Sequence, residues 1–301
     1  MSHIAPSVSL GETTTSVHRK PGLWAGAMRR VWRSPLGKIG VTVVGLVCAV
    51  ALLAPLLAPC DPYVQYAGQE LARPLTRHLL GADELGRDIL SRLIFGTRIS
   101  LLVGIVSVAL GVGIGMTAGL LAGYLGGWVE STVMRISDAL LAFPAILLGI
   151  AVAVVLGPGI INAAIAVGII SIPQFARISR ASVLVEKEKE YVQAARAGGL
   201  GDLAIVFRHV FPNTLAPLLI QMTLAMAYAV LLEAGLSFLG LGAQPPEPSW
   251  GSMLNTSRNY LRQAPWYGIF PGVALSLFLL GLNFLSDAVR DALDPRQKQL
   301  L

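Results

Sequence analysis

The side chains that could carry chemistry are few and widely separated in this sequence. Its four histidines are His3, His18, His78 and His209, and no two of them have the spacing of metal ligands. No glycine-rich loop ends in Gly-Lys-Ser or Gly-Lys-Thr, the signature of a phosphate-binding loop. The serines within apolar runs lack the nearby base that would activate a nucleophile. We therefore predict no catalytic residue, no metal and no cofactor bound by this chain.

One carboxylate lies inside a long apolar segment. Glu233 follows Thr214 by nineteen residues, about 28 Å of helix at 1.5 Å per residue, in a hydrocarbon core of about 30 Å. A charge in a membrane segment is a functional candidate by default, but this depth places it near the outer interface. We expect Glu233 to be an external gate or to pair with an arginine. Asn283, in the last apolar segment, is expected to bond between helices.

The composition indicates an all-α membrane protein. Of 301 residues, 54% are hydrophobic and 13% are charged, about half the charge of an average soluble domain. Mean hydropathy is +0.66. A spanning helix needs about 20 apolar residues, which predicts about six transmembrane helices, the fourth being the shortest. The apolar runs are Ile39 to Ala58, Ile99 to Tyr124, Ala139 to Gly157, Ile160 to Phe175, Leu215 to Leu239 and Ile269 to Leu285.

Lysine and arginine positions predict the topology. They concentrate before the first span and between the fourth and fifth spans, so both segments are expected to face the cytoplasm. An even number of spans then places both termini inside. The net charge of +6 follows from this topology and does not indicate a nucleic-acid partner. The basic residues counted are Arg19, Lys20, Arg29, Arg30, Arg33 and Lys38, and then Arg177, Arg180, Lys187, Lys189, Arg196 and Arg208.

The chain divides into segments by composition. Residues 1–22 are expected to be disordered, residues 23–38 to form an interfacial amphipathic helix, and residues 39–58 to form the first span. Residues 59–97 form an external loop, residues 98–288 the transmembrane core, and residues 289–301 a cytoplasmic tail. Within the external loop, residues 79–93 predict an amphipathic helix in which Asp88 pairs with Arg92 four residues later.

A polar segment, residues 190–213, predicts a hairpin of two short helices broken at Gly198 and Gly199. Ala194 and Ala195 give its first helix a face without bulk, which a partner surface can approach closely. Asp202 is expected to cap the second helix, which ends at Arg208, and Asn213 to cap the next span. The charged run 186–190 also suits an ordinary solvated connection, but long connections without a function are uncommon.

A glycine seam runs along the second span. Gly111, Gly115, Gly119 and Gly123 repeat at every fourth position, with Gly127 and Ser107 continuing the period. Such small-residue spacing lets another helix approach to backbone contact. We expect close packing inside this subunit, the alternative being a moving surface between subunits.

The hairpin resembles the cytoplasmic coupling loop of ABC importer permeases, whose motif runs Glu-Ala-Ala, three residues, Gly, nine residues, Ile, one residue and Leu-Pro. Here Gln193, His209 and Phe211 replace the motif's Glu, Ile and Leu, while the alanine pair, the glycine and the proline are kept. The resemblance implies a contact with ATPase subunits inside the expected coupling loop, residues 176–212. The residues it implicates are Glu190, Gln193, Ala194, Ala195, Arg196, Gly199 and Pro212.

Further blocks resemble permeases of the dipeptide, oligopeptide and nickel ABC importers, specifically the second of their two permease subunits. These blocks are residues 80–92, 96–101, 122–127, 237–242, 244–251 and 290–296. The resemblance implies a type I importer permease fold in a bacterial inner membrane. It also implies a heterodimer with a second permease, an external solute-binding protein, and two cytoplasmic ATPase subunits that bind ATP and magnesium.

Two classes of function compete on these observations. One is the permease of an ATP-driven importer, and the other is a secondary transporter that uses Glu233 as its coupling carboxylate. The hairpin favours the importer, because a secondary transporter needs no such surface and would place charges at the midplane. Dipeptides or longer peptides are the expected substrates, with glutathione and nickel chelates as alternatives.

Overall fold

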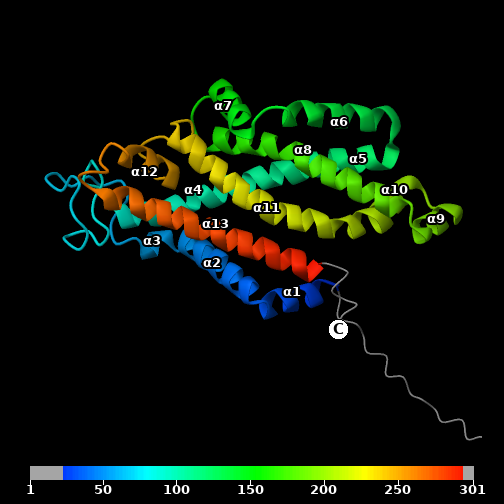
Figure 1. The fold of residues 1–301 in the computed structure, drawn as a ribbon, viewed down its shortest axis with the longest axis horizontal. Coiled ribbons are helices and arrows are strands. Elements are labelled where there is room, and N and C mark those ends of the chain that lie inside the picture. Colours follow the sequence, from blue (N-terminus) through cyan, green and yellow to red (C-terminus); the bar gives the residue numbers. More distant parts are fainter. Residues whose placement is uncertain (1–22, 294–301) are drawn as a thin grey trace, which may run out of the picture.

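A computed structural model describes residues 23–293, and this part of the chain is helical, with one isolated bridge between Ala82 and Asp88 (Figure 1). The shorter helices are α1 (Leu23–Arg33), α3 (Ala54–Leu57), α5 (Thr117–Leu125), α6 (Gly127–Leu141), α7 (Ala145–Leu156), α9 (Glu190–Ala197), α10 (Asp202–Ile205) and α12 (Trp250–Ser257). The longer helices are α2 (Pro35–Leu52), α4 (Ile89–Leu110), α8 (Ile160–Lys187), α11 (Phe211–Phe238) and α13 (Pro265–Leu293). Two π-helical segments, Gly111–Met116 and Val206–Val210, join α4 to α5 and α10 to α11.

The membrane architecture agrees with the sequence prediction. Five helices are long and apolar enough to cross a bilayer, and there are six if the bent pair α6 and α7 counts as one span. Two of the five are compound helices, Ile89–Leu125 and Asp202–Phe238. The predicted all-α fold with about six spans is therefore confirmed for the part of the chain that the structure describes.

The third predicted span, Ala139 to Gly157, is not one helix. The chain bends by 94° between α6 and α7. Pro144 precedes α7 as its N-cap residue, and the residue before a proline is sterically disfavoured in the helical region, so α6 ends before it. The fourth span shows the opposite result, because α8 continues through Pro173 as far as Lys187. The first long helix starts at Pro35, earlier than expected, because the Ser34 side chain accepts a hydrogen bond from the Gly37 backbone N–H at 3.2 Å.

The external segment before α4 differs from the predicted amphipathic helix. The helix begins only at Ile89, and Asp88 caps it by accepting a hydrogen bond from the Ser91 backbone N–H at 2.7 Å. Asp88 also contacts the His78 ring at 3.0 Å. The predicted Asp88–Arg92 pair is wrong, because Arg92 pairs with Asp83 at 3.3 Å instead. The capping role holds the Asp88 carboxylate at the helix N-terminus, where the orphan N–H groups and the helix dipole favour an anion.

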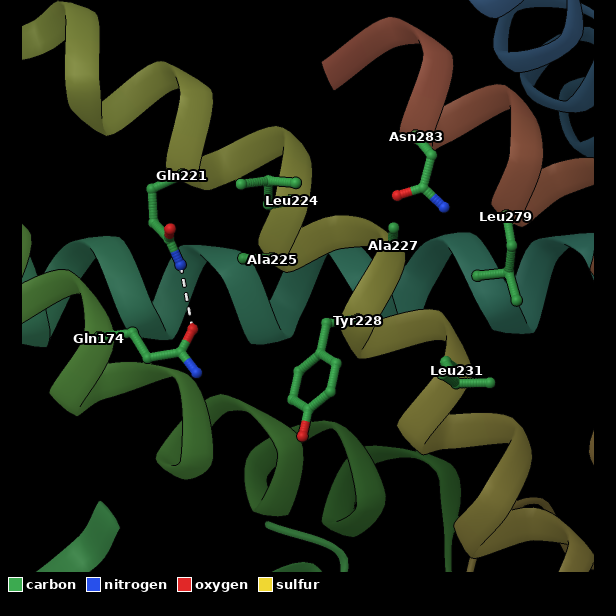
Figure 2. Close-up of a pocket in the computed structure, with 9 residues that line it drawn as sticks. All are labelled: Gln174, Gln221, Leu224, Ala225, Ala227, Tyr228, Leu231, Leu279 and Asn283. Carbon is green, nitrogen blue, oxygen red and sulfur yellow. Dashed lines mark hydrogen bonds between the residues drawn. The ribbon is translucent and has the colours of Figure 1, made fainter. Parts of the chain in front are cut away.

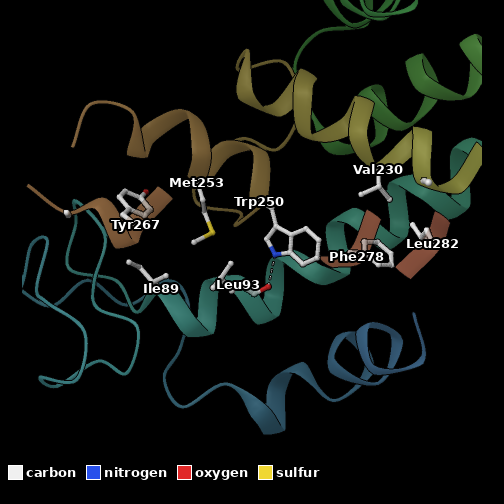
Figure 3. Close-up of a cluster of buried hydrophobic side chains, with 10 residues drawn as sticks. Ile89, Leu93, Val230, Trp250, Met253, Tyr267, Phe278 and Leu282 are labelled. Atoms are coloured by element: carbon white, nitrogen blue, oxygen red, sulfur yellow. Dashed lines mark hydrogen bonds between the residues drawn. The ribbon is translucent and has the colours of Figure 1, made fainter. Parts of the chain in front are cut away.

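A buried hydrophobic cluster that includes Trp250, Tyr267 and Phe278 joins α4, α11, α12 and α13 (Figure 3). The Trp250 indole N–H donates to the Leu93 carbonyl at 3.0 Å, and its ring meets Phe278 edge-on with centroids 6.0 Å apart. A Cβ on Gly96 would lie 3.0 Å from the indole ring, so this position needs a small residue. Trp250 therefore fixes α12 to the helices below it.

The polar connections gather at opposite ends of the bundle. The segment before α4 and the short helix α12 lie at one end, and α9 and α10 lie at the other (Figure 1). The connections that the sequence predicts to lie on opposite sides of the membrane are therefore separated in the structure. At the side of the bundle, Val31 of α1 packs against Ala288 and Ala292 near the end of α13.

The glycine seam packs against α8 inside this chain. A Cβ on Gly115 would lie 2.3 Å from the Ile172 carbonyl oxygen, and one on Gly119 would lie 2.2 Å from the Ala176 carbonyl oxygen. Gly111 faces Phe175, Gly123 faces Arg180 and Val183, and the Ser107 hydroxyl donates to the Ala164 carbonyl at 2.9 Å. Gly127 lies beyond this contact, with open space around it and a φ of +58°. The seam is therefore a backbone contact between α8 and the compound helix Ile89–Leu125.

We predict that Gly119→Leu destabilises the subunit, because the new side chain has to push α8 away from its backbone contact. Overpacking of this kind costs about 1–3 kcal/mol or more. Thermal unfolding and the yield of detergent-extracted protein measure the effect. Gly113→Leu is the matched control, since a Cβ there meets nothing within 4 Å. Equal stability of the two variants would contradict the packing argument.

Candidate functional site

The first arm of the hairpin, residues 190–213, ends in a Schellman turn. The Leu200 N–H donates to the Ala195 carbonyl at 3.2 Å, and the Gly199 N–H donates to the Arg196 carbonyl at 3.0 Å. Gly199 has a φ of +80°, the left-handed conformation that this turn requires. Gly198 keeps a φ of −75°, so only one of the two glycines is left-handed, contrary to the sequence expectation.

The second arm is longer than predicted. The chain is helical without a break from Asp202 to Phe238, so the hairpin continues directly into the membrane helix α11. Gly201, and not Asp202, is the N-cap residue, and Asn213 lies inside the helix. The helix widens into a π-helical segment just before Pro212, a local adjustment that accommodates a residue without an N–H.

The base of the hairpin is an apolar core. Val192 from the first arm and Ile205 and Val210 from the second are fully buried, together with Val183 of α8. Leu120 of α5 completes this cluster. The hairpin is therefore packed onto α5 and α8 and does not hang as a free loop.

Polar contacts of Tyr191 fasten the two arms together. The Tyr191 hydroxyl donates to the Glu186 carboxylate and accepts from the Asn213 side-chain amide at 3.0 Å. Partial burial and the Glu186 carboxylate raise the pKa of Tyr191 to about 12. The phenol therefore remains a proton donor throughout the physiological pH range.

A second contact ties the hairpin to α5. The Tyr124 hydroxyl donates to Asp202 Oδ1 at 2.5 Å, and the Arg196 guanidinium lies 6.0 Å from the centre of the Tyr124 ring. Asp202 therefore has a different role from the predicted cap. It connects the start of the second arm to the end of the glycine-bearing helix.

The tip of the hairpin presents small and apolar groups to solvent. Ala194 and Gly199 are exposed and Ala195 is half-buried. Two apolar side chains that sequence reasoning missed lie on the second arm, Leu203 at 75% and Phe207 at 65% exposure. Their spacing of four residues, which places them on one face of a helix, was the available signal. The other implicated residues, Glu190, Gln193, Arg196 and Pro212, are also exposed.

Glu233 lies far from the hairpin, in the last turns of α11. It is 1% exposed, accepts a hydrogen bond from Ser237 at 2.7 Å, and contacts the Ser100 hydroxyl of α4 at 3.4 Å. No lysine or arginine among the described residues pairs with it. The predicted alternative of an arginine partner is therefore wrong, because two serine hydroxyls take that place.

The fold and the hairpin define the class of protein: a multi-span membrane protein that carries a packed, exposed hairpin. Residues 115–299 match the family model described as binding-protein-dependent transport system inner membrane component. Residues 22–74 match the N-terminal transmembrane domain of oligopeptide transport permease C. The chain belongs to this family of ABC importer permeases, which work in bacterial inner membranes with ATPase subunits and a solute-binding protein.

Curated relatives match most of the chain. It is 42% identical over 275 residues to the dipeptide transport system permease protein DppC of Alkalihalophilus pseudofirmus, covering 91% of this chain and 90% of that protein. It is 45% identical over 267 residues to the DppC protein of Escherichia coli K12, with coverage of 87% and 89%. The glutathione transport system permease protein GsiD of Pectobacterium atrosepticum is 45% identical over 276 residues, with coverage of 91% and 92%.

A solved structure supports the fold. A chain from the MetNI methionine ABC transporter in inward-facing conformations superposes with a TM-score of 0.57 at 21% identity. The match covers 68% of this chain and 98% of that chain. At this identity the likeness concerns the fold, and it agrees with the expected type I importer architecture.

We predict that Tyr191→Phe loosens the hairpin, because it removes the hydroxyl that links Glu186 to Asn213. A net loss of about 1 kcal/mol corresponds to roughly fivefold faster amide hydrogen exchange in residues 190–200, which mass spectrometry can measure. Because the folded-state pKa is raised from 10.0 to about 12, the stabilisation is fully present below about pH 10. It is lost as the pH rises through about 12. Unchanged exchange at neutral pH would contradict the fastening role.

Proposed function

We propose that this chain is the permease subunit of an ATP-driven importer of di- and oligopeptides, paired with a second, homologous permease. The observation that carries the proposal is the packed hairpin with its small, apolar tip, on a chain whose relatives include dipeptide permeases at 42% and 45% identity. ATP and magnesium are bound by the two ATPase subunits and not by this chain. Both termini lie in the cytoplasm, on the side of the hairpin.

The continuous helix Asp202–Phe238 supports a mechanism of coupling. The exposed surface of the hairpin, with Ala194, Gly199 and Phe207, inserts into an ATPase subunit. Because the second arm has no break before α11, a displacement of the tip moves the membrane helix as well. ATP-driven closure of the ATPases therefore changes the side of the membrane to which the permease opens.

Glu233 serves as the external gate in this proposal. Its carboxylate holds the outer part of α11 to Ser100 of α4. The α12 helix covers the same place, since Gly251 packs directly against the Ala234 carbonyl and the Ser237 side chain. Opening toward the solute-binding protein separates these contacts, and closing restores them.

Glutathione import is a second candidate. It is supported by the relatives named glutathione transport system permease protein, at 45% and 46% identity. Glutathione is itself a tripeptide with an unusual linkage, so the two candidates share most of their chemistry. Competition between glutathione and alanine dipeptides for uptake distinguishes them.

We predict that the complex, reconstituted in vesicles with its partner permease, its ATPases and its solute-binding protein, imports dipeptides only when ATP is supplied. Glu233→Gln replaces the carboxylate with an amide that can still bond Ser237 and Ser100. We expect the altered gate to slow uptake, which should still require ATP. A proton gradient alone should drive no uptake in either protein. Gradient-driven uptake without ATP would falsify the importer mechanism and support the secondary transporter.

We predict that Phe207→Asp abolishes stimulation of ATP hydrolysis by the loaded solute-binding protein. Phe207 is largely exposed, so the substitution should leave the fold intact while placing a charge in an apolar docking surface. Phe207→Leu is the control, because it keeps an apolar group and should retain most of the stimulation. Co-purification of the ATPases reports docking directly. Normal stimulation in Phe207→Asp would remove this residue from the docking surface.

A further inference from the structure

A polar groove, whose lining includes neither Glu233 nor a hairpin residue, lies between α8, α11 and α13 (Figure 2). Gln174 of α8, Gln221 and Tyr228 of α11, and Asn283 of α13 line a cavity of about 380 Å³. Apolar side chains complete the wall: Leu224, Ala225, Ala227, Leu231 and Leu279. No charged side chain lines it.

The polar groups of this groove have unused hydrogen-bonding capacity. The Gln221 side-chain amide donates to Gln174 Oε1 at 3.0 Å, which leaves the Gln221 oxygen and the Gln174 amide N–H groups free for a ligand. Within residues 23–293, the side chains of Asn283 and Tyr228 make no hydrogen bond. The expectation that Asn283 bonds between helices is therefore not met in this chain.

The depth of these residues decides what the groove faces. Gln174 is the second-last residue of the fourth apolar run, Ile160 to Phe175, and Gln221 is the seventh residue of the fifth, Leu215 to Leu239. Asn283 and Tyr228 are exposed on the isolated chain. Amides at this depth that faced acyl chains would lose water without gaining a partner, which is costly. Because Gln174 and Asn283 lie near the hairpin-side ends of their apolar runs, the groove opens to water on that side of the membrane.

The chemistry of the wall selects a class of ligand. Carboxamides offer both donors and acceptors without charge, so they match the N–H and C=O groups of a peptide main chain. The absence of a lining charge disfavours peptide termini, phosphates and metal ions. The cavity volume falls within the range of about 300–1,000 Å³ typical of small-molecule sites.

We propose that Gln174, Gln221 and Asn283 form a wall of the translocation path that binds the main-chain amide groups of the transported peptide. The inference rests on the proposed function of peptide import and adds the recognition chemistry. Recognition of the main chain does not depend on the side chains of the peptide. The neighbouring Leu224, Leu231 and Leu279 provide apolar contacts that do not require a fixed orientation. The groove then accepts peptides of varied sequence.

Methylated peptides test the recognition of the main chain. The complete reconstituted importer is assayed with alanyl-alanine and with the same dipeptide methylated at its peptide nitrogen, which lacks that N–H donor. The ratio of the two uptake efficiencies is compared between the wild type and the double variant Gln221→Met, Asn283→Leu. Any preference of the solute-binding protein affects both permeases equally and cancels in this comparison.

We expect methylation to lower uptake by the wild type more than uptake by the double variant, with a difference of roughly three- to tenfold for one or two lost hydrogen bonds. Leu279→Met is the matched control, because it lines the same groove without hydrogen-bonding capacity, and it should show the wild-type ratio. Equal ratios in the wild type and the double variant would overturn the proposal.

Thiol labelling tests whether the groove is aqueous. In a background carrying Cys48→Ser and Cys60→Ser, Asn283→Cys should react with a membrane-impermeant thiol reagent, and alanyl-alanine should slow the reaction. Leu277→Cys, which lies in an apolar groove against α2, should not react. An unreactive Cys at position 283 that instead crosslinks to the partner permease would identify the groove as a permease contact and refute the proposal.

Peptide uptake by the wild-type complex separates the proposed function from main-chain recognition in the groove. A wild-type complex that imports no peptide removes the proposed function and this inference together. A wild type that imports peptides, with an unchanged methylation ratio in the double variant, removes this inference alone.

Discussion

Backbone contact between α8 and the glycine face of the compound helix Ile89–Leu125 is the constraint on which the rest of the bundle depends. Burying apolar surface between helices in a bilayer gives no hydrophobic free energy, because the lipid tails are also apolar. Close packing therefore holds the helices together. Gly115 and Gly119 allow that approach because the facing groups are carbonyls of α8. The helices α6, α7 and α11 then pack on the remaining faces of α8. Val183 of α8 lies in the base of the hairpin and Gln174 of α8 lies in the polar groove. The position of this one helix therefore sets the distance between the two features.

A second constraint is the continuity of the helix Asp202–Phe238. The same continuous helix carries Phe207 at the hairpin, Gln221 in the groove and Glu233 near its other end. Its two ends are held differently. The hairpin end is packed through Val192, Ile205 and Val210 but leaves its tip open, whereas the outer end is enclosed by α4 and α12. An element with one open and one enclosed end can transmit a displacement across the membrane.

Ion pairs contribute to the arrangement mainly where they are shielded from water. At the outer end, Asp83 and Arg87 pair at 2.6 Å with little exposure of either side chain. Near the hairpin, Arg177 pairs with Asp138 between α8 and α6, but both side chains are at least half exposed. Exposed pairs of that kind contribute about 0–1 kcal/mol. The α6 helix is therefore positioned by its packing on α5 and α8 more than by this pair.

The sequence by itself determined the membrane class, the approximate number of spans, the glycine seam and the hairpin, because each of these depends on residue types at close spacing along the chain. It also indicated Ala194, Ala195 and Gly199 as the tip of the hairpin. Only the tertiary structure decided the bend before Pro144, the contacts of Asp88, and the exposure of Leu203 and Phe207. The polar groove unites helices whose residues are far apart in sequence. Which face a helix turns toward water, lipid or a neighbour depends on the elements packed around it, and that information is not local to any segment.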